Sequence, residues 1–256
     1  MRFFLVIIMA ILPSLVSAVE NQECVVLLHG LCRTGRSMIP MEQALSQAGY
    51  KVLNLDYPSR SASIEKLSDD AIGRAVADCQ KDDAAQIHFV THSLGGILVR
   101  SYLSRHTVPN LGRVVMLGPP NQGSEVVDKL GWLWIFKKIN GPTGSKLGTD
   151  KNSTPNQLGP ANFCAGVIAD DRSINWINSL MIAGDDDGKV SVERTKLAGM
   201  TDHIVIHATH PLLMRNRTAI RQTIQFLRLG KFERQLDVSA RPIEDGGWIQ
   251  PGGSVK

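Results

Sequence analysis

Residues 86–106 read QIHFVTHSLGGILVRSYLSRH, and this stretch decides the fold. Gln86–Val90 is a short run rich in β-branched and aromatic residues, as in a buried strand. Leu94–His106 places apolar residues at helical spacing, which predicts an amphipathic helix. Between the two lies THSLGG, with Ser93 at the junction. The sequence therefore predicts a buried strand, a sharp turn at Ser93 and a helix.

The same alternation of strand and helix extends on both sides of this stretch. Further strands are predicted at Cys24–Leu28, Lys51–Asp56, Arg113–Leu117, Phe163–Ala169 and Asp202–His207, and further helices from Ser37 to Ala48, at Ile64–Cys79 and at Arg215–Leu229. Strands and helices in this rhythm indicate an α/β fold, with a mostly parallel central sheet covered by helices on both faces.

The composition is that of an ordinary globular protein. The 256 residues are 43% hydrophobic and 20% charged, which excludes a disordered chain, a collagen-like repeat and a coiled coil. The net charge of +4 is weak, and the basic residues are scattered along the chain. Nucleic acid is therefore not an expected partner. One large domain, residues 19–229, accounts for this length better than two domains do.

The first 18 residues have the pattern of a signal peptide. Arg2 precedes the apolar run Phe3–Leu12, and the small residues Val16–Ala18 offer a cleavage site. We therefore expect an exported protein, either periplasmic or secreted, and removal of Arg2 would lower the net charge from +4 to +3. An uncleaved N-terminal membrane anchor is the alternative.

Two segments depart from the regular alternation. Residues 123–175 carry Gly-Pro pairs and the aromatic cluster Trp132–Phe136, apart from the one strand predicted there. Irregular segments this long inside a compact domain usually serve as lids or binding loops, so a lid or cap insertion is expected. The aromatic cluster fits the working surface of such a lid, and ordinary packing within the cap explains the cluster equally well. Residues 230–256 are rich in glycine, proline and charge, which predicts a loosely ordered tail.

The cysteines permit disulfide bonds. Four of them remain after cleavage: Cys24, Cys32, Cys79 and Cys164. An even number in an exported chain predicts up to two disulfides, and the sequence leaves all three pairings open. The chain has no Cys-x-x-Cys pair, which argues against a zinc ribbon or a thioredoxin-like redox site.

Ser93 is the candidate nucleophile. A serine at a tight strand-to-helix turn presents its hydroxyl above the sheet, and small residues two positions before and after it let neighbouring backbone pass closely. Thr91 and Gly95 occupy those positions. The alternative is a serine that only caps the helix. The position of Ser93 between a strand and a helix favours a nucleophile over a helix cap.

A serine nucleophile needs a base, and His210 is the candidate among the seven histidines. It follows the last predicted strand, and Pro211 predicts an extended backbone at His210. His207 is the second choice. A metal site formed by His203, His207 and His210 is not expected, because residues running from a strand into a loop share no common face.

The base in turn needs an acid, and Asp187 is the candidate. It lies in the run Asp185–Asp187, directly before the turn residue Gly188. Asp170 and Asp171, which follow the strand predicted to end at Ala169, are the alternative acids. A calcium loop at the three carboxylates is not expected, because the run lacks the spacing of oxygen ligands.

Backbone N–H groups complete the candidate site. Acyl transfer places negative charge on a carbonyl oxygen, and two preorganised N–H groups aimed there each contribute about 3 kcal/mol. Gly30 ends the first buried strand and permits a turn that points the Leu31 N–H into the site. Leu94, at the start of the helix after Ser93, is the second donor.

At these residues the chain resembles the α/β-hydrolase superfamily, in particular its bacterial lipases and esterases. Four blocks carry the resemblance: VLLHGL at 26–31, THSLGG at 91–96, GPPNQGS at 118–124, and DDGKV at 186–190 leading to Thr209-His210. The order serine, acid, histidine is that of the family. Thr91 stands where the family pattern often has glycine, and alanine, serine or threonine is also compatible with the pattern at this position.

The resemblance implies an α/β-hydrolase fold with a lid or cap, Ser93 as nucleophile, His210 as base, Asp187 as acid, and Leu31 and Leu94 as oxyanion donors. It implies hydrolysis of carboxylic esters through an acyl-enzyme, without a metal or an organic cofactor. Expected partners are a small-molecule or lipid ester and transient contact with a lipid surface. A thioesterase, amidase or acyltransferase with the same triad is the alternative, as is a hydrolase fold used only for binding.

Overall fold

The computed structural model of this chain describes residues 22–130, 141, 143–144, 146–172 and 189–234. The predicted signal peptide at 1–18, the aromatic cluster Trp132–Phe136 and Asp187 lie outside the described residues. Within the described ranges, no helix is both long enough and apolar enough for a membrane span.

A single six-stranded sheet forms the centre of the described structure. Its strands are β1 (Cys24–Leu28), β2 (Lys51–Leu55), β3 (Ile87–His92), β4 (Leu111–Leu117), β5 (Ala165–Arg172) and β6 (Asp202–Thr209). They lie in the order β2-β1-β3-β4-β5-β6, and neighbouring strands are parallel throughout. Because all the strands point the same way, the residues that follow each strand meet at one edge of the sheet.

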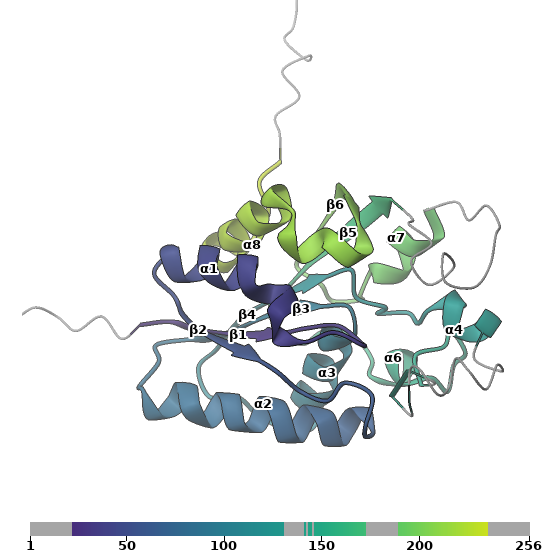
Figure 1. The fold of residues 1–256 in the computed structure, drawn as a ribbon, viewed down its shortest axis with the longest axis horizontal. Coiled ribbons are helices and arrows are strands. Elements are labelled where there is room, and N and C mark those ends of the chain that lie inside the picture. The colour runs from purple at the N-terminus through teal and green to yellow at the C-terminus, as the bar shows by residue number, and fades with distance from the viewer. Residues whose placement is uncertain (1–21, 131–140, 142, 145, 173–188, 235–256) are drawn as a thin grey trace, which may run out of the picture.

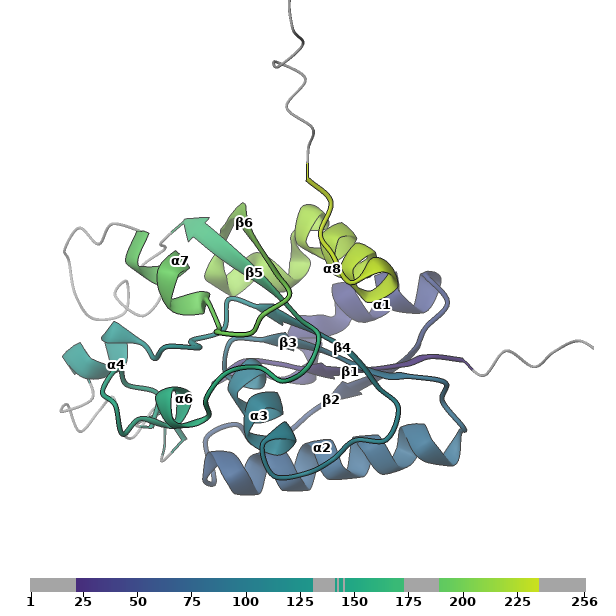
Figure 2. The same cartoon turned by 180° about the vertical axis from the view of Figure 1, so that it is seen from behind.

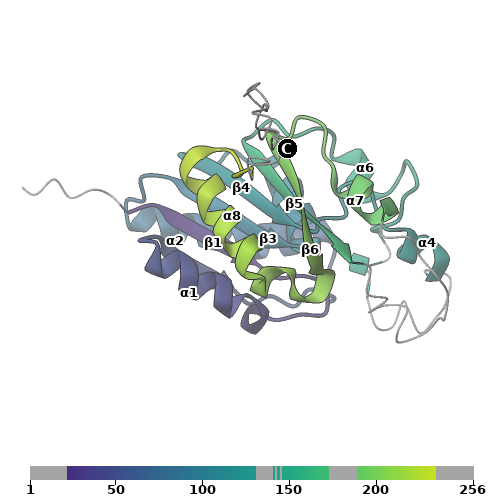
Figure 3. The ribbon, with the colours of Figure 1, turned by 90° about the horizontal axis from the view of Figure 1, so that it is seen from above.

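Helices cover both faces of this sheet, as predicted (Figure 1). One face carries α1 (Ile39–Gln47) and α8 (Arg217–Leu229), which cross over it in Figure 3, and the other carries α2 (Ile64–Lys81) and α3 (Leu94–Leu103). The short helices α4 (Glu125–Leu130), α6 (Thr154–Gln157) and α7 (Lys189–Thr195) gather beyond one end of the sheet (Figures 1 and 2). The 3-10 helices are η1 (Gly35–Met38) and η2 (His210–Arg215). The fold class is confirmed.

The core lies in two layers, one on each side of the sheet. In β1 every side chain is fully buried, and successive residues alternate between the layers. Val25 and Leu27 pack on the side of α1 and α8, whereas Val26 and Leu28 pack on the side of α2 and α3. This burial on both faces explains why the strand is a continuous apolar run rather than an alternating one.

Polar caps and one glycine set the ends of the covering helices. The Ser63 side chain accepts a hydrogen bond from the Lys66 N–H at 3.3 Å and begins α2. The Asn216 side chain accepts from the N–H of Thr218 and of Ala219 and begins α8. Gly230 ends α8 in the left-handed conformation, with φ +70°. Just beyond it, Phe232 is buried and its ring contacts Phe226.

Strand ends differ from the sequence-based prediction, because hydrogen bonding to neighbours continues past the apolar runs. β3 extends through His92, which pairs with Leu117 of β4. β5 begins at Ala165 and extends through Arg172, so Asp170 and Asp171 lie within the strand and not after it. The helix after Ser93 ends at Leu103, three residues before the predicted end.

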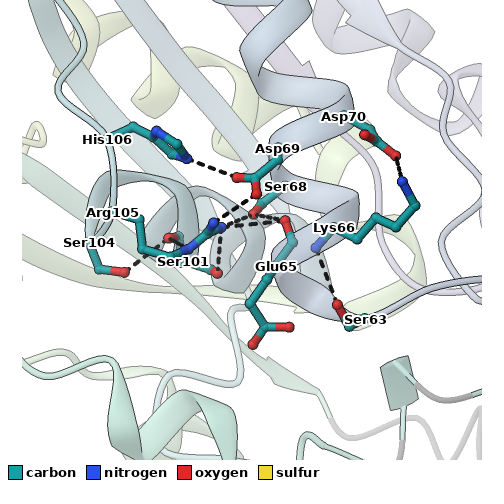
Figure 4. A network of polar contacts seen from close by, with 10 residues as sticks. All are labelled: Ser63, Glu65, Lys66, Ser68, Asp69, Asp70, Ser101, Ser104, Arg105 and His106. Atoms are coloured by element: carbon teal, nitrogen blue, oxygen red, sulfur yellow. Dashed lines mark hydrogen bonds and ion pairs between the residues drawn. The ribbon is translucent and has the colours of Figure 1, made fainter.

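A polar network joins α2 to the end of α3 (Figure 4). Arg105 donates to Asp69 at 2.8 Å and to Ser68 at 2.7 Å, and His106 contacts Asp69 at 3.0 Å. The hydrogen bond from Arg105 holds the pKa of Asp69 below its ordinary value. These contacts give His106 a structural role between two helices.

One disulfide lies within the described residues. It joins Cys24, at the start of β1, to Cys79, near the end of α2, and both residues are fully buried. Cys32 and Cys164 are not bridged to another cysteine in the described part of the chain. Of the two disulfides that the sequence permits, the structure therefore forms one.

We expect removal of this bridge to destabilise the protein. A cross-link over 55 residues restricts the unfolded chain, so Cys24→Ala/Cys79→Ala should lower the free energy of unfolding by about 2–4 kcal/mol. Urea unfolding with and without dithiothreitol measures this difference. The reductant should weaken the wild type and the control Cys164→Ser alike and leave the double variant unchanged. Equal sensitivity of all three proteins would contradict the bridge.

Candidate active site

Ser93 occupies a strained turn between β3 and α3. Its backbone has φ +52° and ψ −119°, a conformation that costs a non-glycine residue about 1–3 kcal/mol. The Ser93 side chain makes no capping hydrogen bond to α3. In the stretch Ile87–Arg100, every residue except Ser93 is buried, and Ser93 is half-buried. The geometry fits a nucleophile that is accessible at the turn and gives no support to the alternative of a helix-capping serine.

Close backbone approach explains the glycines around Ser93. A Cβ at Gly95 would lie 2.8 Å from the Leu28 carbonyl oxygen, so a larger residue would push α3 away from β1. A Cβ at Gly30 would lie 2.8 Å from Nδ1 of His92 and 3.2 Å from Cβ of Ser93. These two glycines allow the loop after β1 and the start of α3 to meet at the serine.

His210 follows β6 and lies at the same edge of the sheet. It is the first residue of η2, so the extended backbone predicted from Pro211 is wrong. Proline is tolerated in the first turn of a helix, because its missing N–H would have no partner there. A Cβ at Gly118, the residue after β4, would lie 2.6 Å from Nδ1 of His210. The neighbouring Leu117 carbonyl accepts the Ser93 N–H at 2.9 Å. Ser93 and His210 therefore flank the same end of β4.

A buried carboxylate lies behind the His210 ring. Oδ1 of Asp170 is 3.3 Å from Nδ1 of His210, and Asp170 is 4% exposed. The next residue, Asp171, points to the opposite face of β5 and pairs with the exposed His207 at 3.0 Å. Asp170, an alternative acid in the sequence analysis, is thus the carboxylate that the described structure brings to His210. Asp187 stays a prediction.

The oxyanion donors predicted from the sequence lie on both sides of Ser93. Leu94 is the first residue of α3, and the N–H of a first helical residue has no acceptor inside its helix. Leu31 follows Gly30 in the loop after β1 and is half-buried. Their role in binding an oxyanion stays a prediction.

His29 and Tyr57 brace the loop that carries Leu31, and neither role was predicted from the sequence. The His29 ring stacks on Tyr57 at 4.1 Å, and Nδ1 of His29 donates to the Gly30 carbonyl at 2.8 Å. The Tyr57 hydroxyl donates to the His29 carbonyl oxygen. Burial lowers the pKa of His29, which favours a neutral ring. A histidine at the end of a fully apolar run was the available signal.

Arg100 anchors the segments that surround the site, a role that was not predicted from the sequence either. The arginine is buried on α3 and donates to the carbonyl oxygens of Asn121, Pro155 and Gly159 at 2.8–3.0 Å. Burial lowers its pKa to about 10. The Asn121 side chain also accepts from Arg100 and donates to the Thr195 carbonyl at the end of α7. Arg100 and Asn121 therefore tie α3 to the segment after β4, to α6 and to α7.

His203, His207 and His210, the three histidines in or directly after β6, each contact a different partner. His203 contacts Thr195, His207 pairs with Asp171, and His210 faces Asp170. No group of three or more potential ligands gathers for a metal ion in the described part of the chain.

Solved structures with this fold carry different activities. No curated protein matches the chain. The mature lipase BlEst2 of Bacillus licheniformis is similar with TM-score 0.62 and 16% identity, over 81% of this chain and 93% of that one. The esterase PF2001 of Pyrococcus furiosus has TM-score 0.56 and 18% identity, over 82% of each chain. A bromoperoxidase from Bacillus anthracis has TM-score 0.51 and 17% identity, over 81% of this chain and 92% of that one. Identities this low show the fold alone.

Family membership comes from the sequence match. The model of the alpha/beta hydrolase family matches residues 25–218, from β1 to the first residues of α8. This range includes Ser93, His210 and the three candidate acids, Asp170, Asp171 and Asp187. The chain belongs to the alpha/beta hydrolase family.

Proposed function

We propose that this protein is a serine hydrolase of carboxylic esters that works through a covalent acyl-enzyme. The observation that carries the proposal is the convergence of a strained, half-buried Ser93 and a carboxylate-backed His210 at one end of β4. A turn that costs conformational energy and leaves the hydroxyl without a capping role is what a nucleophile requires. The substrate class is a small-molecule or lipid ester.

The proposed reaction has two stages. His210 takes the proton of the Ser93 hydroxyl as its oxygen attacks the ester carbonyl, and the N–H groups of Leu31 and Leu94 stabilise the resulting oxyanion. The intermediate then expels the alcohol, which receives the proton from His210. In the second stage, His210 takes a proton from water, and the resulting hydroxide attacks the acyl group. Ser93 leaves with the proton returned by His210, and the free acid is released.

A carboxylate beside Nδ1 sets the tautomer and the orientation of the His210 ring. The carboxylate accepts the Nδ1–H, so the lone pair of His210 lies on Nε2, which is the atom that takes the serine proton. It also stabilises the imidazolium that forms at that moment. We propose Asp187 for this role, with Asp170 as the second candidate because it lies 3.3 Å from the ring.

We further propose that the protein is exported. The apolar N-terminal run after Arg2 supports this, and the buried Cys24–Cys79 disulfide suits an oxidising compartment. Residues 123–175, which include α4 and α6, are proposed as the lid or cap, because these two helices lie beyond the end of the sheet at which β3 leads into Ser93.

A fluorophosphonate probe tests the proposed chemistry directly. The probe forms a covalent bond with an activated serine, so it should label the wild-type protein at Ser93, as located by peptide mass spectrometry. The variant His210→Ala should react at least about 10³-fold more slowly, because the hydroxyl then lacks its base. The matched control His207→Ala, which replaces an exposed histidine, should be labelled at the wild-type rate. Labelling at another serine, or an equal rate in His210→Ala, would refute the proposal.

A further inference from the structure

His92, the residue before Ser93, makes direct contact with His210. Its Nε2 lies 3.0 Å from the backbone carbonyl oxygen of His210, and the two rings have centroids 4.8 Å apart at an angle of 40°. His92 is the last residue of β3 and is 2% exposed. The two residues are 118 positions apart in the sequence, so this contact joins the serine strand to the element that carries the base.

The hydrogen bond determines which nitrogen of His92 carries the proton. A carbonyl oxygen can only accept, so Nε2 must donate and carry the hydrogen. Nδ1 then holds a lone pair, and this buried atom has no hydrogen-bond partner in the described structure. It faces Gly30, whose Cβ, if present, would lie 2.8 Å away. The ring is therefore held between the loop after β1 and the backbone of His210.

His92 also has to stay uncharged. Burial lowers its pKa well below the ordinary value, and repulsion from His210 whenever that ring is protonated, and from the Arg33 guanidinium, acts in the same direction. A second proton on Nδ1 would have no acceptor among the described residues. His210 becomes an imidazolium during the proposed reaction, and a charged ring at 4.8 Å would oppose that step.

We propose that His92 is a positioning residue, which holds the backbone of His210 in register with Ser93 through the hydrogen bond to its carbonyl oxygen. His92 does not touch the reacting atoms. It acts through His210, the first residue of η2. The hydrogen bond fixes the backbone of His210 and therefore the position from which the imidazole side chain extends. This inference rests on the proposed function.

The test compares variants that keep or lose the donor. In His92→Gln, the amide nitrogen lies near the place of Nε2 and can still donate to His210. His92→Asn is one methylene shorter and cannot reach it, and His92→Leu has no donor. Displacement of a catalytic group by about 1 Å can cost about 10²-fold in rate. We expect kcat for p-nitrophenyl esters to fall by about 30–100-fold in the asparagine and leucine variants, with KM within about threefold of wild type, and by less than about fivefold in the glutamine variant.

His88 provides a matched control on the same strand. It is equally buried but lies at the opposite end of β3, where it contacts Glu23 at 3.2 Å and accepts the Arg113 N–H at 2.8 Å. His88→Leu should lower the melting temperature but leave kcat within about twofold of wild type, because its partners Glu23 and Arg113 lie at the other end of β3 from Ser93 and His210.

The outcomes distinguish a failure of the His92 proposal from a failure of the proposed function. Equal kcat in the glutamine and asparagine variants, or a loss expressed in KM, overturns the role of His92, and this comparison remains decisive where His92→Leu fails to fold. A loss in His88→Leu as large as in His92→Asn would show a general packing effect and would overturn it too. If the wild type neither turns over esters nor reacts with the fluorophosphonate, the proposed function fails and this inference falls with it.

Discussion

Replacing Ser93 with alanine is expected to lower kcat/KM for p-nitrophenyl acyl esters by about 10⁴-fold or more, while the melting temperature stays within about 2 °C of wild type. The rate falls because the variant lacks the hydroxyl that the proposed acyl-enzyme requires. Stability is preserved because the Ser93 hydroxyl makes no capping hydrogen bond, and the Ser93 N–H still donates to the Leu117 carbonyl in the variant. Steady-state kinetics and thermal unfolding measure the two quantities.

Ser93→Gly is the companion variant that separates chemistry from strain. Glycine adopts the φ of +52° without steric cost, so this variant should be as inactive as alanine but more stable, by about 1 kcal/mol. A residue that lowers stability and is indispensable for rate is the signature of a functional site. Retained turnover in either variant would remove Ser93 from the nucleophile role. Unchanged stability in the glycine variant would contradict the strain.

The fold was predictable because burial on both faces leaves a clear signal in the sequence. Runs such as Val25–Leu28 are apolar throughout, and the amphipathic helices between them bury one side. The ends of the strands were not predictable in the same way. Asp170 and Asp171 break the apolar run, yet β5 continues through them because β6 supplies hydrogen bonds as far as Thr209.

The serine turn and the histidine after β6 could be located from residue type and position along the chain. Contacts made across the sheet could not. His29 contacts Tyr57 28 residues away, Arg100 contacts partners 21 to 59 residues away, and His92 contacts His210 118 residues away. A single sequence contains no signal for such pairings. The same limit applies to Asp170, which alternation of the strand directs toward His210 while Asp171 faces the other way.

These missed residues share a physical role around the candidate site. His29 fixes the loop that carries Leu31, His92 holds the backbone of His210, and Arg100 ties α3 to α6 and to the segment after β4. All three are buried and donate hydrogen bonds to backbone carbonyl oxygens. A site assembled from loops on several strands needs such supports, because the loops would otherwise move independently.

Replacement of the acid that faces His210 is expected to give the second large loss of activity. Asp187→Asn is expected to lower kcat by about 10³–10⁴-fold, because an amide facing Nδ1 can donate its own hydrogen and reverse the tautomer of His210. Asp170→Asn should cost about tenfold. Its contact to the ring, at 3.3 Å, is longer than the 2.7–2.9 Å of a charge-assisted hydrogen bond, so it holds the imidazole weakly. In the sequence, Asp187 comes directly before Gly188 and two positions before Lys189, the first residue of α7.

Asp171→Asn is the matched control for this pair of variants. It changes the same group on the same strand, but its carboxylate pairs with the exposed His207 on the other face of β5, so kcat should not change. Thermal unfolding of each variant separates a loss of fold from a loss of rate. A larger loss in Asp170→Asn than in Asp187→Asn would move the acid into β5, directly behind the ring. Full activity in both variants, and in the double variant, would leave His210 without an acid and would contradict the triad.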